Sequence, residues 1–201
     1  MPTIGISGGS GSGKSTVVNE LITRLPDNGV AVIHQDAYYW DNGDKSHQEK
    51  QQINFDHPDA IEWEMLISQL KDLKLGESIE MPHYSYVTCA RSAETTLVQP
   101  RKIIIIEGIL ILTEPGLRDL LDIKVFVDTD PNERLRRIIR RDMDERGRSP
   151  GQELRHYETF VKPMHVKFIE PSKRFADIIV PRGGKNRVAL DILVSHIQMT
   201  D

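Results

Sequence analysis

The sequence of 201 residues contains a single cysteine, which excludes a disulfide within the chain and a metal site built from several cysteines. It also lacks a long hydrophobic run, because the longest, residues 103–112, is interrupted by Glu107 and is far too short to span a bilayer. Residues 1–5 show neither the basic segment nor the apolar stretch of a secretory signal. We therefore expect a cytoplasmic protein with no membrane partner.

An excess of positive charge is missing as well. The chain carries 26 Lys and Arg residues against 30 Asp and Glu residues, which gives a formal net charge of −4. General binding of nucleic acid depends on a basic surface, so we expect no nucleic-acid partner. With 14 glycines and 11 prolines the chain is neither collagen-like nor of low complexity. Its length predicts one domain over residues 1–201.

The apolar pattern predicts an α/β fold. Five short apolar segments predict strands at residues 3–7, 30–34, 103–106, 123–127 and 178–180. Helical spacing of apolar residues recurs between or after them, at residues 17–25, 61–73, 135–143 and 188–196. Apolar strands separated by such helices predict a parallel sheet covered on both faces. Residues 78–100 break this rhythm and predict a β-hairpin insertion that forms a lip over one end of the sheet.

A glycine-rich loop follows the first predicted strand. Residues 8–15 read GGSGSGKS, which fits G-x-x-x-x-G-K-[ST] between a strand and a helix. Backbone N–H groups of such a loop can converge on phosphate oxygens, and the helix N-terminus adds a positive dipole. The pattern predicts that this loop binds the phosphate tail of a nucleotide, with Lys14 at the β- and γ-phosphates. The alternative is that the loop is only a flexible connector. The predicted binding residues are Gly8, Gly9, Ser10, Gly11, Ser12, Gly13, Lys14, Ser15 and Thr16.

Two carboxylates at strand ends can complete a site for phosphoryl transfer. Glu107 ends a run of four isoleucines and, with the Ser15 hydroxyl, can hold Mg²⁺. Asp36 follows the second predicted strand, whose carboxyl end we expect beside the phosphate loop. There it can orient and deprotonate a hydroxyl. The alternatives on local sequence are a strand-end charge in water for Glu107 and a helix cap or turn for Asp36.

The third component of the predicted site is a basic segment. Residues 134–148 contain seven arginines and three acidic residues. Helical spacing predicts a core-facing stripe of Leu135, Ile138, Ile139 and Met143. Arg134, Arg137 and Arg141 then lie on an adjoining face. Arginines that close over a transferring phosphoryl group neutralise developing charge and exclude water, so we predict a lid over about residues 134–156. The alternative is a solvated basic helix face.

With these residues assembled, the chain resembles the uridine kinase family of P-loop small-molecule kinases, a sister of the phosphoribulokinases. The resemblance extends from residue 5 to about residue 197. Besides the phosphate loop it rests on the order of several short segments, at 35–36, 54–60, 82–86, 107–108, 141–148, 168–173 and 176–186. It implies transfer of the γ-phosphate of ATP, or of GTP, to the 5′-hydroxyl of uridine or cytidine in pyrimidine salvage, with Mg²⁺.

The resemblance also implies roles for particular residues. Asp36 is the general base, Ser15 and Glu107 serve the Mg²⁺, and Arg141 and Arg146 belong to the closing lid. The residues assigned to the nucleoside are Tyr39, Asp56, Tyr84, Tyr86, Cys89, Arg148 and His156. The Asp56 carboxylate suits two ribose hydroxyls, although residues 56–59 also read as a helix entry. A small-molecule nucleoside partner, a homotetramer and inhibition by pyrimidine triphosphates are further expectations.

Three positions depart from the family pattern. Cys89 stands where family members more often have a His or a Tyr that reads the pyrimidine edge, and a thiol is a poor hydrogen-bonding group. Ile138 replaces an arginine close to the substrate, and His156 falls where other members have a Gln. Two other functions therefore stay open: a kinase for another small hydroxyl compound such as a sugar phosphate, and a nucleotide-dependent switch. The chain lacks the N-K-x-D motif of switch GTPases.

Overall fold

The computed structural model describes residues 1–25, 29–50, 52–146 and 149–200. Its strands are β1 (Thr3–Ser7), β2 (Val30–His34), β3 (Ile79–Ser85), β4 (Ala90–Val98), β5 (Ile103–Glu107), β6 (Ile123–Asp128) and β7 (Ile178–Pro181). Its α-helices are α1 (Lys14–Arg24), α2 (His47–Lys50), α3 (Trp63–Leu75), α4 (Pro115–Arg118), α5 (Pro131–Arg146), α6 (Pro150–His156), α7 (Lys162–Met164), α8 (Glu170–Ser172) and α9 (Arg187–Thr200). Short 3-10 helices are η1 (Gln35–Tyr38), η2 (Pro58–Ala60), η5 (Lys173–Phe175) and η6 (Gly183–Lys185), and π-helical segments are η3 (Tyr157–Val161) and η4 (His165–Ile169).

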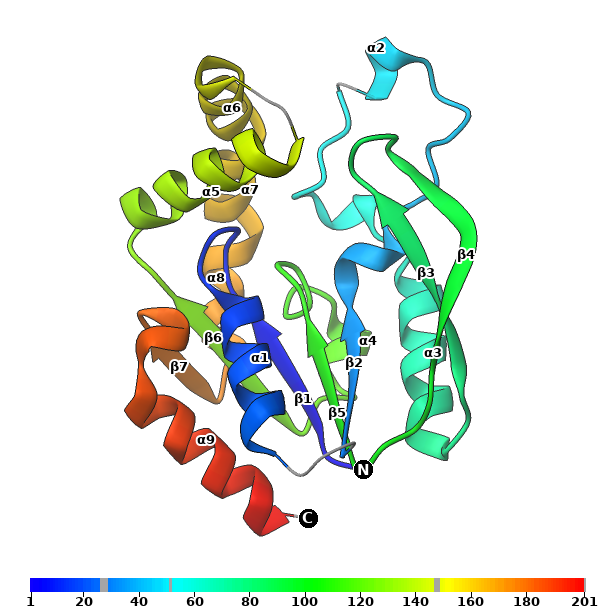
Figure 1. The fold of residues 1–201 in the computed structure, drawn as a ribbon, viewed down its shortest axis with the longest axis vertical. Helices are drawn as coiled ribbons and strands as arrows, with labels where there is room; N and C mark the ends of the chain where they lie inside the picture. Colours follow the sequence, from blue (N-terminus) through cyan, green and yellow to red (C-terminus); the bar gives the residue numbers. More distant parts are fainter. Residues whose placement is uncertain (26–28, 51, 147–148, 201) are drawn as a thin grey trace.

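The central sheet of the described chain is parallel, with the strand order β2-β5-β1-β6-β7. Each of its strands was predicted from the sequence, and β5, β6 and β7 run one residue longer than expected. The central strand β1 therefore has β5 on one side and β6 on the other. The carboxyl ends of all these strands lie at one edge, which is the upper edge in Figure 1.

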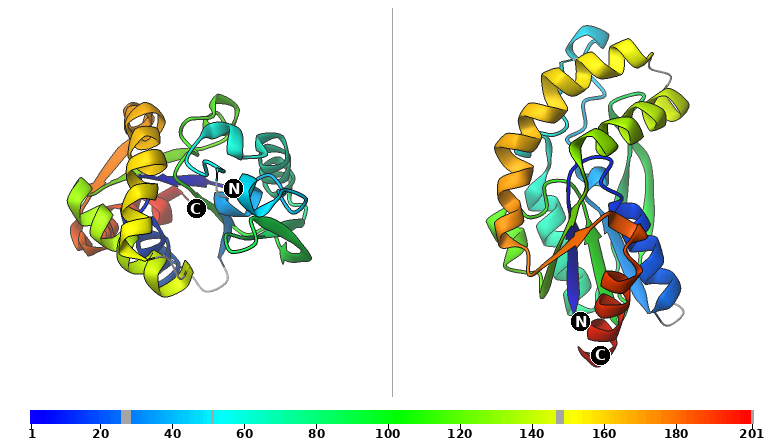
Figure 2. Two further views of the ribbon diagram at one scale, coloured as in Figure 1. Left: turned by 90° about the horizontal axis from the view of Figure 1, so that it is seen from above. Right: turned by 90° about the vertical axis from the view of Figure 1, so that its left-hand side faces the viewer.

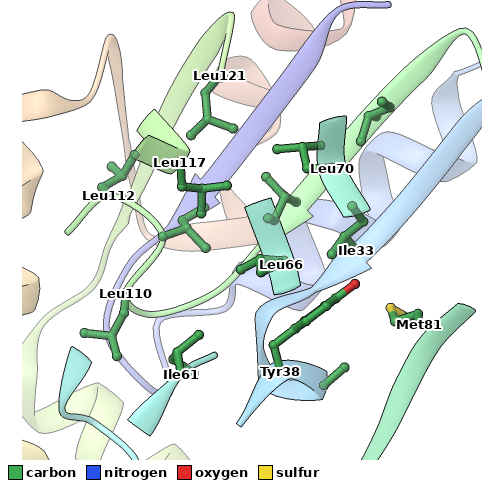
Figure 3. Packing of buried hydrophobic residues seen from close by; sticks show 14 of the residues in the cluster. Ile33, Tyr38, Ile61, Leu66, Leu70, Met81, Leu110, Leu112, Leu117 and Leu121 are labelled. Atoms are coloured by element: carbon green, nitrogen blue, oxygen red, sulfur yellow. The ribbon is translucent and has the colours of Figure 1, made fainter. Parts of the chain in front are cut away.

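Helices cover both faces of this sheet, as predicted. Successive side chains of a strand point to opposite faces. Ile104 and Ile106 accordingly pack into one buried cluster with α3 and α4, whereas Ile103 and Ile105 pack into a second one with α1 and α9. Figure 3 shows part of the first cluster, where side chains of α3 lie beside Ile33 of β2. None of the helices in the described ranges is long and apolar enough to cross a membrane.

The predicted insertion is a β-hairpin. Strands β3 and β4 pair antiparallel in a sheet of their own, with a register shift between Pro82 and Tyr84. The hairpin runs alongside α3, and its tip extends past the carboxyl edge of the central sheet (Figure 1). Cys89 lies at this tip in a left-handed conformation, with φ of 51°. The hairpin thus forms one wall above the phosphate loop.

A helical arm faces the hairpin. Helix α5 rises from β6, and the helix that runs from α6 to α8 passes behind it in the view of Figure 1 and lies beside it in the right panel of Figure 2. Pro163 and Pro171 lack the backbone donor of a regular helix, and each follows a π-helical segment. Ser149 caps α6, the start of the second helix of the arm, with a capping box that Gln152 completes.

The predicted apolar stripe of α5 is only partly correct. Ile138 is buried against Tyr157 and Val161 of the arm, as the spacing requires. Met143, however, is 44% exposed, while Arg134 is only 3% exposed. The reason is that α5 extends beyond the edge of the sheet, so its last turns have no sheet to pack on. The first turns of α5 lie against the phosphate loop instead, where Arg134 donates to a backbone carbonyl of the loop.

Candidate active site

The phosphate loop connects β1 to α1, as predicted, and it depends on its glycines. Gly8, Gly11 and Gly13 have φ values of 143°, 73° and 95°, a region that side chains disfavour. A Cβ atom at Gly8 would lie 2.4 Å from the carbonyl oxygen of Val127, and one at Gly11 would lie 2.7 Å from that of Arg134. Close packing of β6 and α5 against the loop therefore leaves no room for larger residues.

A cavity of about 510 Å³ opens at the carboxyl edge of the sheet, between the hairpin and the helical arm. The predicted site residues that line it are Ser10, Gly11, Gly13, Lys14, Ser15, Thr16, Asp36, Tyr39, Asp56, Tyr86, Glu107, Arg141 and His156. Others are absent from the described lining, namely Gly8, Gly9, Ser12, Tyr84 and Cys89. Arg146 is the last residue of α5, and Arg148 lies outside the described residues.

Ser15 and Glu107 meet at the floor of this cavity. The Ser15 hydroxyl donates to the Glu107 carboxylate at 3.2 and 3.3 Å, and His34 Nδ1 lies 2.8 Å from the same carboxylate. Burial raises the pKa of Glu107, but the hydrogen bond from His34 and the charge of Lys14 lower that pKa by more. Glu107 is thus held as a carboxylate. A hydroxyl beside a carboxylate is an oxygen-donor pair of the kind that Mg²⁺ prefers.

Lys14 lies at the same floor. Its ammonium group donates to the carbonyl oxygen of Gly9 at 3.3 Å. Burial lowers the pKa of Lys14, and the carboxylates of Glu107 and Asp36 act against that shift. Carboxylates beside a buried lysine favour its charged form, which is the form that attracts a phosphate entering the cavity.

Asp36 follows β2, as the sequence indicates, and its position in the cavity depends on its neighbour Gln35. The strand β5 lies between β2 and β1, yet the carboxyl end of β2 faces the same cavity as the phosphate loop, since His34 and Lys14 both line it. Buried Gln35 accepts a hydrogen bond from the backbone N–H of Leu110 at 2.8 Å, which ties η1 to the loop after β5. Gly108 makes room for it, since a Cβ there would lie 2.3 Å from Gln35. Asp36 is the next residue and lines the cavity.

An aromatic cluster forms the hairpin side. The rings of Tyr39, Phe55 and Tyr86 lie within 5.0 to 5.7 Å of one another, and Tyr84 packs behind them at 5.2 Å from Tyr39. The rings of Tyr84 and Tyr86 lie 5.8 Å apart, although Tyr86 follows the end of β3. Cys89 donates from its Sγ to the carbonyl oxygen of Tyr86 at 3.5 Å. Sequence reasoning missed Phe55, although it precedes Asp56 in a segment that the resemblance included.

Asp56 lies beside this cluster and is 6% exposed. Its backbone N–H donates to the Asn54 side chain at 3.2 Å, whereas the helix-entry role at η2 belongs to His57, which accepts from the backbone of Asp59. The side chains of Asn54 and His57, and not that of Asp56, therefore accept the hydrogen bonds of this turn and of the helix entry. The Asp56 carboxylate lines the cavity opposite the phosphate loop.

The helical arm contributes the third side. Arg141 Nε donates to the buried Asp142 carboxylate at 2.6 Å. Burial lowers the pKa of Arg141, but this hydrogen bond and the charge of Asp142 raise it by more. His156 of α6 lines the cavity with its ring 5.3 Å from that of Phe160. Ile138 also lines it, at a turn of α5 that the core packing of Tyr157 holds in place.

The structure has the fold of a P-loop kinase. Its parallel sheet carries a glycine-rich loop after the central strand, and Lys14, Ser15 and Glu107 lie at the floor of a cavity with polar and aromatic walls. The chain belongs to the Phosphoribulokinase / Uridine kinase family, whose model matches residues 3–189. The family resemblance and the α/β fold predicted from the sequence are thereby confirmed.

Curated relatives cover nearly the whole chain. It is 49% identical over 195 residues to a uridine kinase of Ligilactobacillus salivarius (strain UCC118), a match that covers 97% of this chain and 92% of the relative. It is 50% identical over 195 residues to a uridine kinase of Clostridium botulinum (strain Okra / Type B1), covering 97% and 95%.

Solved structures show the same fold at lower identity. A structure described as a "Possible Uridine Kinase" from Bacillus stearothermophilus matches with a TM-score of 0.55 and 26% identity, over 89% of this chain and 88% of that one. A D-glycerate 3-kinase from Cryptococcus neoformans matches with a TM-score of 0.61 and 15% identity, over 86% and 80% of the two chains. The second likeness concerns the fold alone.

Proposed function

We propose that this protein is a uridine/cytidine kinase, which transfers the γ-phosphate of ATP to the 5′-hydroxyl of its nucleoside in pyrimidine salvage. The observation that carries the proposal is a single cavity lined by Lys14 and Ser15 at one end and by Asp56 and Tyr86 at the other, with Asp36 also in its wall. Relatives that are about half identical over nearly their whole length are uridine kinases, which supports the same acceptor.

Asp36 is the proposed general base. A carboxylate in the wall between the phosphate end and the nucleoside end can accept a hydrogen bond from the 5′-hydroxyl and take its proton as the oxygen attacks phosphorus. Lys14 at the floor and Arg141 of α5 would stabilise the negative charge that develops on the transferring phosphoryl group. Gly8 to Thr16 would hold the phosphate tail through backbone N–H groups.

Mg²⁺ fits the floor of the cavity. Ser15 and Glu107 would hold it, because their oxygens already lie together and Glu107 is kept ionised by His34 and Lys14. Among the described residues no cluster of three or more metal-ligating side chains occurs. That agrees with the usual binding of Mg²⁺ through one or two protein oxygens with phosphate and water. The bound ion would neutralise phosphate charge.

The nucleoside would lie at the hairpin end. Asp56 would accept hydrogen bonds from the ribose hydroxyls. Tyr39 and Tyr86 would border the nucleoside, and Tyr84 packs against both rings. Cys89 would act on the base through its contact with Tyr86, and His156 would approach from the arm.

We further propose a single kinase domain over residues 1–201, with the insertion at about 78–100 as the nucleoside lip and about 134–156, including Arg146 and Arg148, as the lid. The position of the hairpin and of α5 on opposite sides of the cavity supports this division. A cytoplasmic homo-oligomer, tetrameric as the family resemblance implies, with neither nucleic acid nor membrane as partner, completes the proposal.

An assay of ADP release across acceptors and donors tests the function. We expect turnover with uridine, cytidine or both, dependent on Mg²⁺, with ATP as donor and GTP as the donor comparison. Phosphorylated sugars belong in the same screen, because Cys89 and Ile138 depart from the family pattern. Turnover with a sugar phosphate and none with either nucleoside would overturn the proposed acceptor.

A further inference from the structure

The phosphate loop has a second side, formed by its carbonyl oxygens, which the proposed function leaves without a role. Every carbonyl of residues 9–12 accepts a hydrogen bond. That of Gly9 accepts from the backbone of Ser12 at 3.0 Å and from Lys14 at 3.3 Å, within the loop itself. Those of residues 10, 11 and 12 accept from side chains that come from elsewhere in the fold.

Two arginines of α5 supply most of these donors. Arg137 Nη1 donates to the carbonyls of Gly11 and Ser12, at 3.1 and 3.3 Å. Arg134 Nη1 lies 3.4 Å from the carbonyl of Ser10. The sequence had suggested these arginines for an adjoining helix face over the substrate. In the structure both arginines donate to loop carbonyls instead, and Arg137 also lines the cavity beside the loop.

Each arginine is itself held in place. Glu133 accepts from Arg137 at 3.2 Å through Nε and pairs with its Nη2 at 3.1 Å. Arg134 is almost fully buried between the loop and the arm, where a Cβ on Gly9 would lie 2.3 Å from its guanidinium and 2.9 Å from His165. Both guanidinium groups are therefore anchored donors, which hold a peptide orientation better than a mobile side chain.

We propose that Arg137, together with Arg134, is a positioning residue for phosphoryl transfer, because it fixes the loop carbonyls and so keeps the loop N–H groups turned toward the donor phosphates. The C=O and N–H of a planar peptide unit point in opposite directions. A donor that holds the carbonyls of Ser10 and Ser12 therefore turns the N–H groups of Gly11 and Gly13 the other way, while the N–H of Ser12 donates to the Gly9 carbonyl within the loop. This inference rests on the proposed role of the loop in binding the donor.

The same helix connects the loop to the lid. Arg137 and Arg141 are four residues apart on α5, so they lie on one face, one turn from each other. Both residues line the cavity, and Arg137 in addition hydrogen-bonds the loop. Contact between α5 and the loop thereby sets the position of Arg141 relative to the phosphate-binding backbone.

The chain offers a matched pair of variants for the test. Arg137→Ala removes the donor to Gly11 and Ser12, and Arg136→Ala removes the neighbouring arginine, which is 83% exposed and pairs with the same Glu133 at 3.8 Å. Arg137→Lys restores the charge and one donor. Arg134 is a poor first choice, because emptying its buried position can unfold the protein. Thermal unfolding of each variant establishes that it is folded.

Calorimetry with two probes separates positioning from direct contact with the donor. The full chain is titrated with ATP and with inorganic tripolyphosphate, both with Mg²⁺. We expect Arg137→Ala to weaken both by about tenfold, the usual effect of losing hydrogen bonds to a charged group. Arg137→Lys should recover part of the loss, and Arg136→Ala should match the wild type. Amide hydrogen exchange at residues 11–13 should quicken in Arg137→Ala alone.

Two results would overturn the inference. If ATP binds more weakly and tripolyphosphate does not, Arg137 contacts the nucleoside part of the donor. If both bind as in Arg136→Ala, Arg137 has no part in donor binding. The readout needs no acceptor, so a wild type that binds both probes but phosphorylates no nucleoside would contradict the proposed function and leave this inference intact.

Discussion

His34 and Glu107 stand opposite each other at the carboxyl ends of β2 and β5, with 2.8 Å between Nδ1 and the carboxylate. The pair connects the strand that leads into Asp36 to the carboxylate that faces Ser15. The hydrogen bond to Glu107 raises the pKa of His34 by more than partial burial lowers it. Glu107 thus ends β5 and Asp36 follows β2, and the hydrogen bond between His34 and Glu107 connects these two neighbouring strands.

This pair predicts a pH-dependent contribution to stability. Because the pKa of His34 in the folded chain lies above its ordinary value of 6.5, the pair stabilises the fold below about pH 6.5 and loses that effect as pH rises through the folded-state pKa. His34→Gln removes it. Since the His34 side chain is 48% exposed, we expect a difference of no more than about 1 kcal/mol near pH 6. Denaturant unfolding in EDTA should show this difference shrinking toward pH 9, and one that grows instead would contradict the pairing.

We expect the opposite pH dependence of stability from His165. Burial and the neighbouring charge of Arg134 lower its pKa to about 4, against an ordinary 6.5. The unfolded chain takes up a proton in this window before the folded chain does, so stability falls as pH falls from 6.5 toward 4. His165 alone should cost about 2 kcal/mol between pH 7 and pH 5. His165→Asn should flatten the profile of unfolding free energy over that range, and an unchanged slope would show that the imidazole titrates normally.

Replacement of the proposed base should separate binding from chemistry. Asp36→Asn keeps the size of the side chain but cannot accept the hydroxyl proton, so we expect kcat to fall by about 10² to 10⁴. The dissociation constant for ATP should remain near the wild-type value. Asp59→Asn, at a side chain that is 91% exposed, is the control and should leave both parameters unchanged. Wild-type turnover in Asp36→Asn would remove this residue from the mechanism.

Tyr86 should act on the nucleoside and not on the donor. Its ring lines the cavity and packs on Tyr39 and Phe55. Loss of a ring that stacks on a base costs about 1 to 3 kcal/mol. Tyr86→Leu should therefore raise KM for uridine or cytidine by about tenfold or more and leave KM for ATP unchanged. Val87→Ala, at the exposed next residue, is the control. Equal changes in the two KM values would indicate a general disturbance of the hairpin.

Much of the architecture was predictable because its determinants are local. The strands of the central sheet are short apolar runs, and the phosphate loop needs glycine at positions with positive φ. The proximity of Asp36 and Asp56 in one cavity was predicted only through family resemblance, because nothing in their own segments specifies where the two loops meet.

Other features depended on which distant segments pack together. The placement of β5 between β2 and β1 depends on pairings across more than 70 residues, and no periodicity within a strand indicates its neighbour. Helical spacing told us which side chains of α5 share a face but not what each face meets. Arg134 is buried and Met143 exposed because the loop, and not the sheet, lies beneath the start of that helix.

The linear order of residues was thus sufficient for the strands of the central sheet, the helices α1, α3, α5 and α9, the phosphate loop and the identity of its family. Backbone geometry and side-chain periodicity act over a few residues. The site itself was decided by packing. Residues more than 90 apart, such as Ser15 and Glu107 or Arg137 and Gly11, meet only when the chain has folded. Their hydrogen bonds and shifted pKa values follow from burial, a property that a segment acquires from its surroundings.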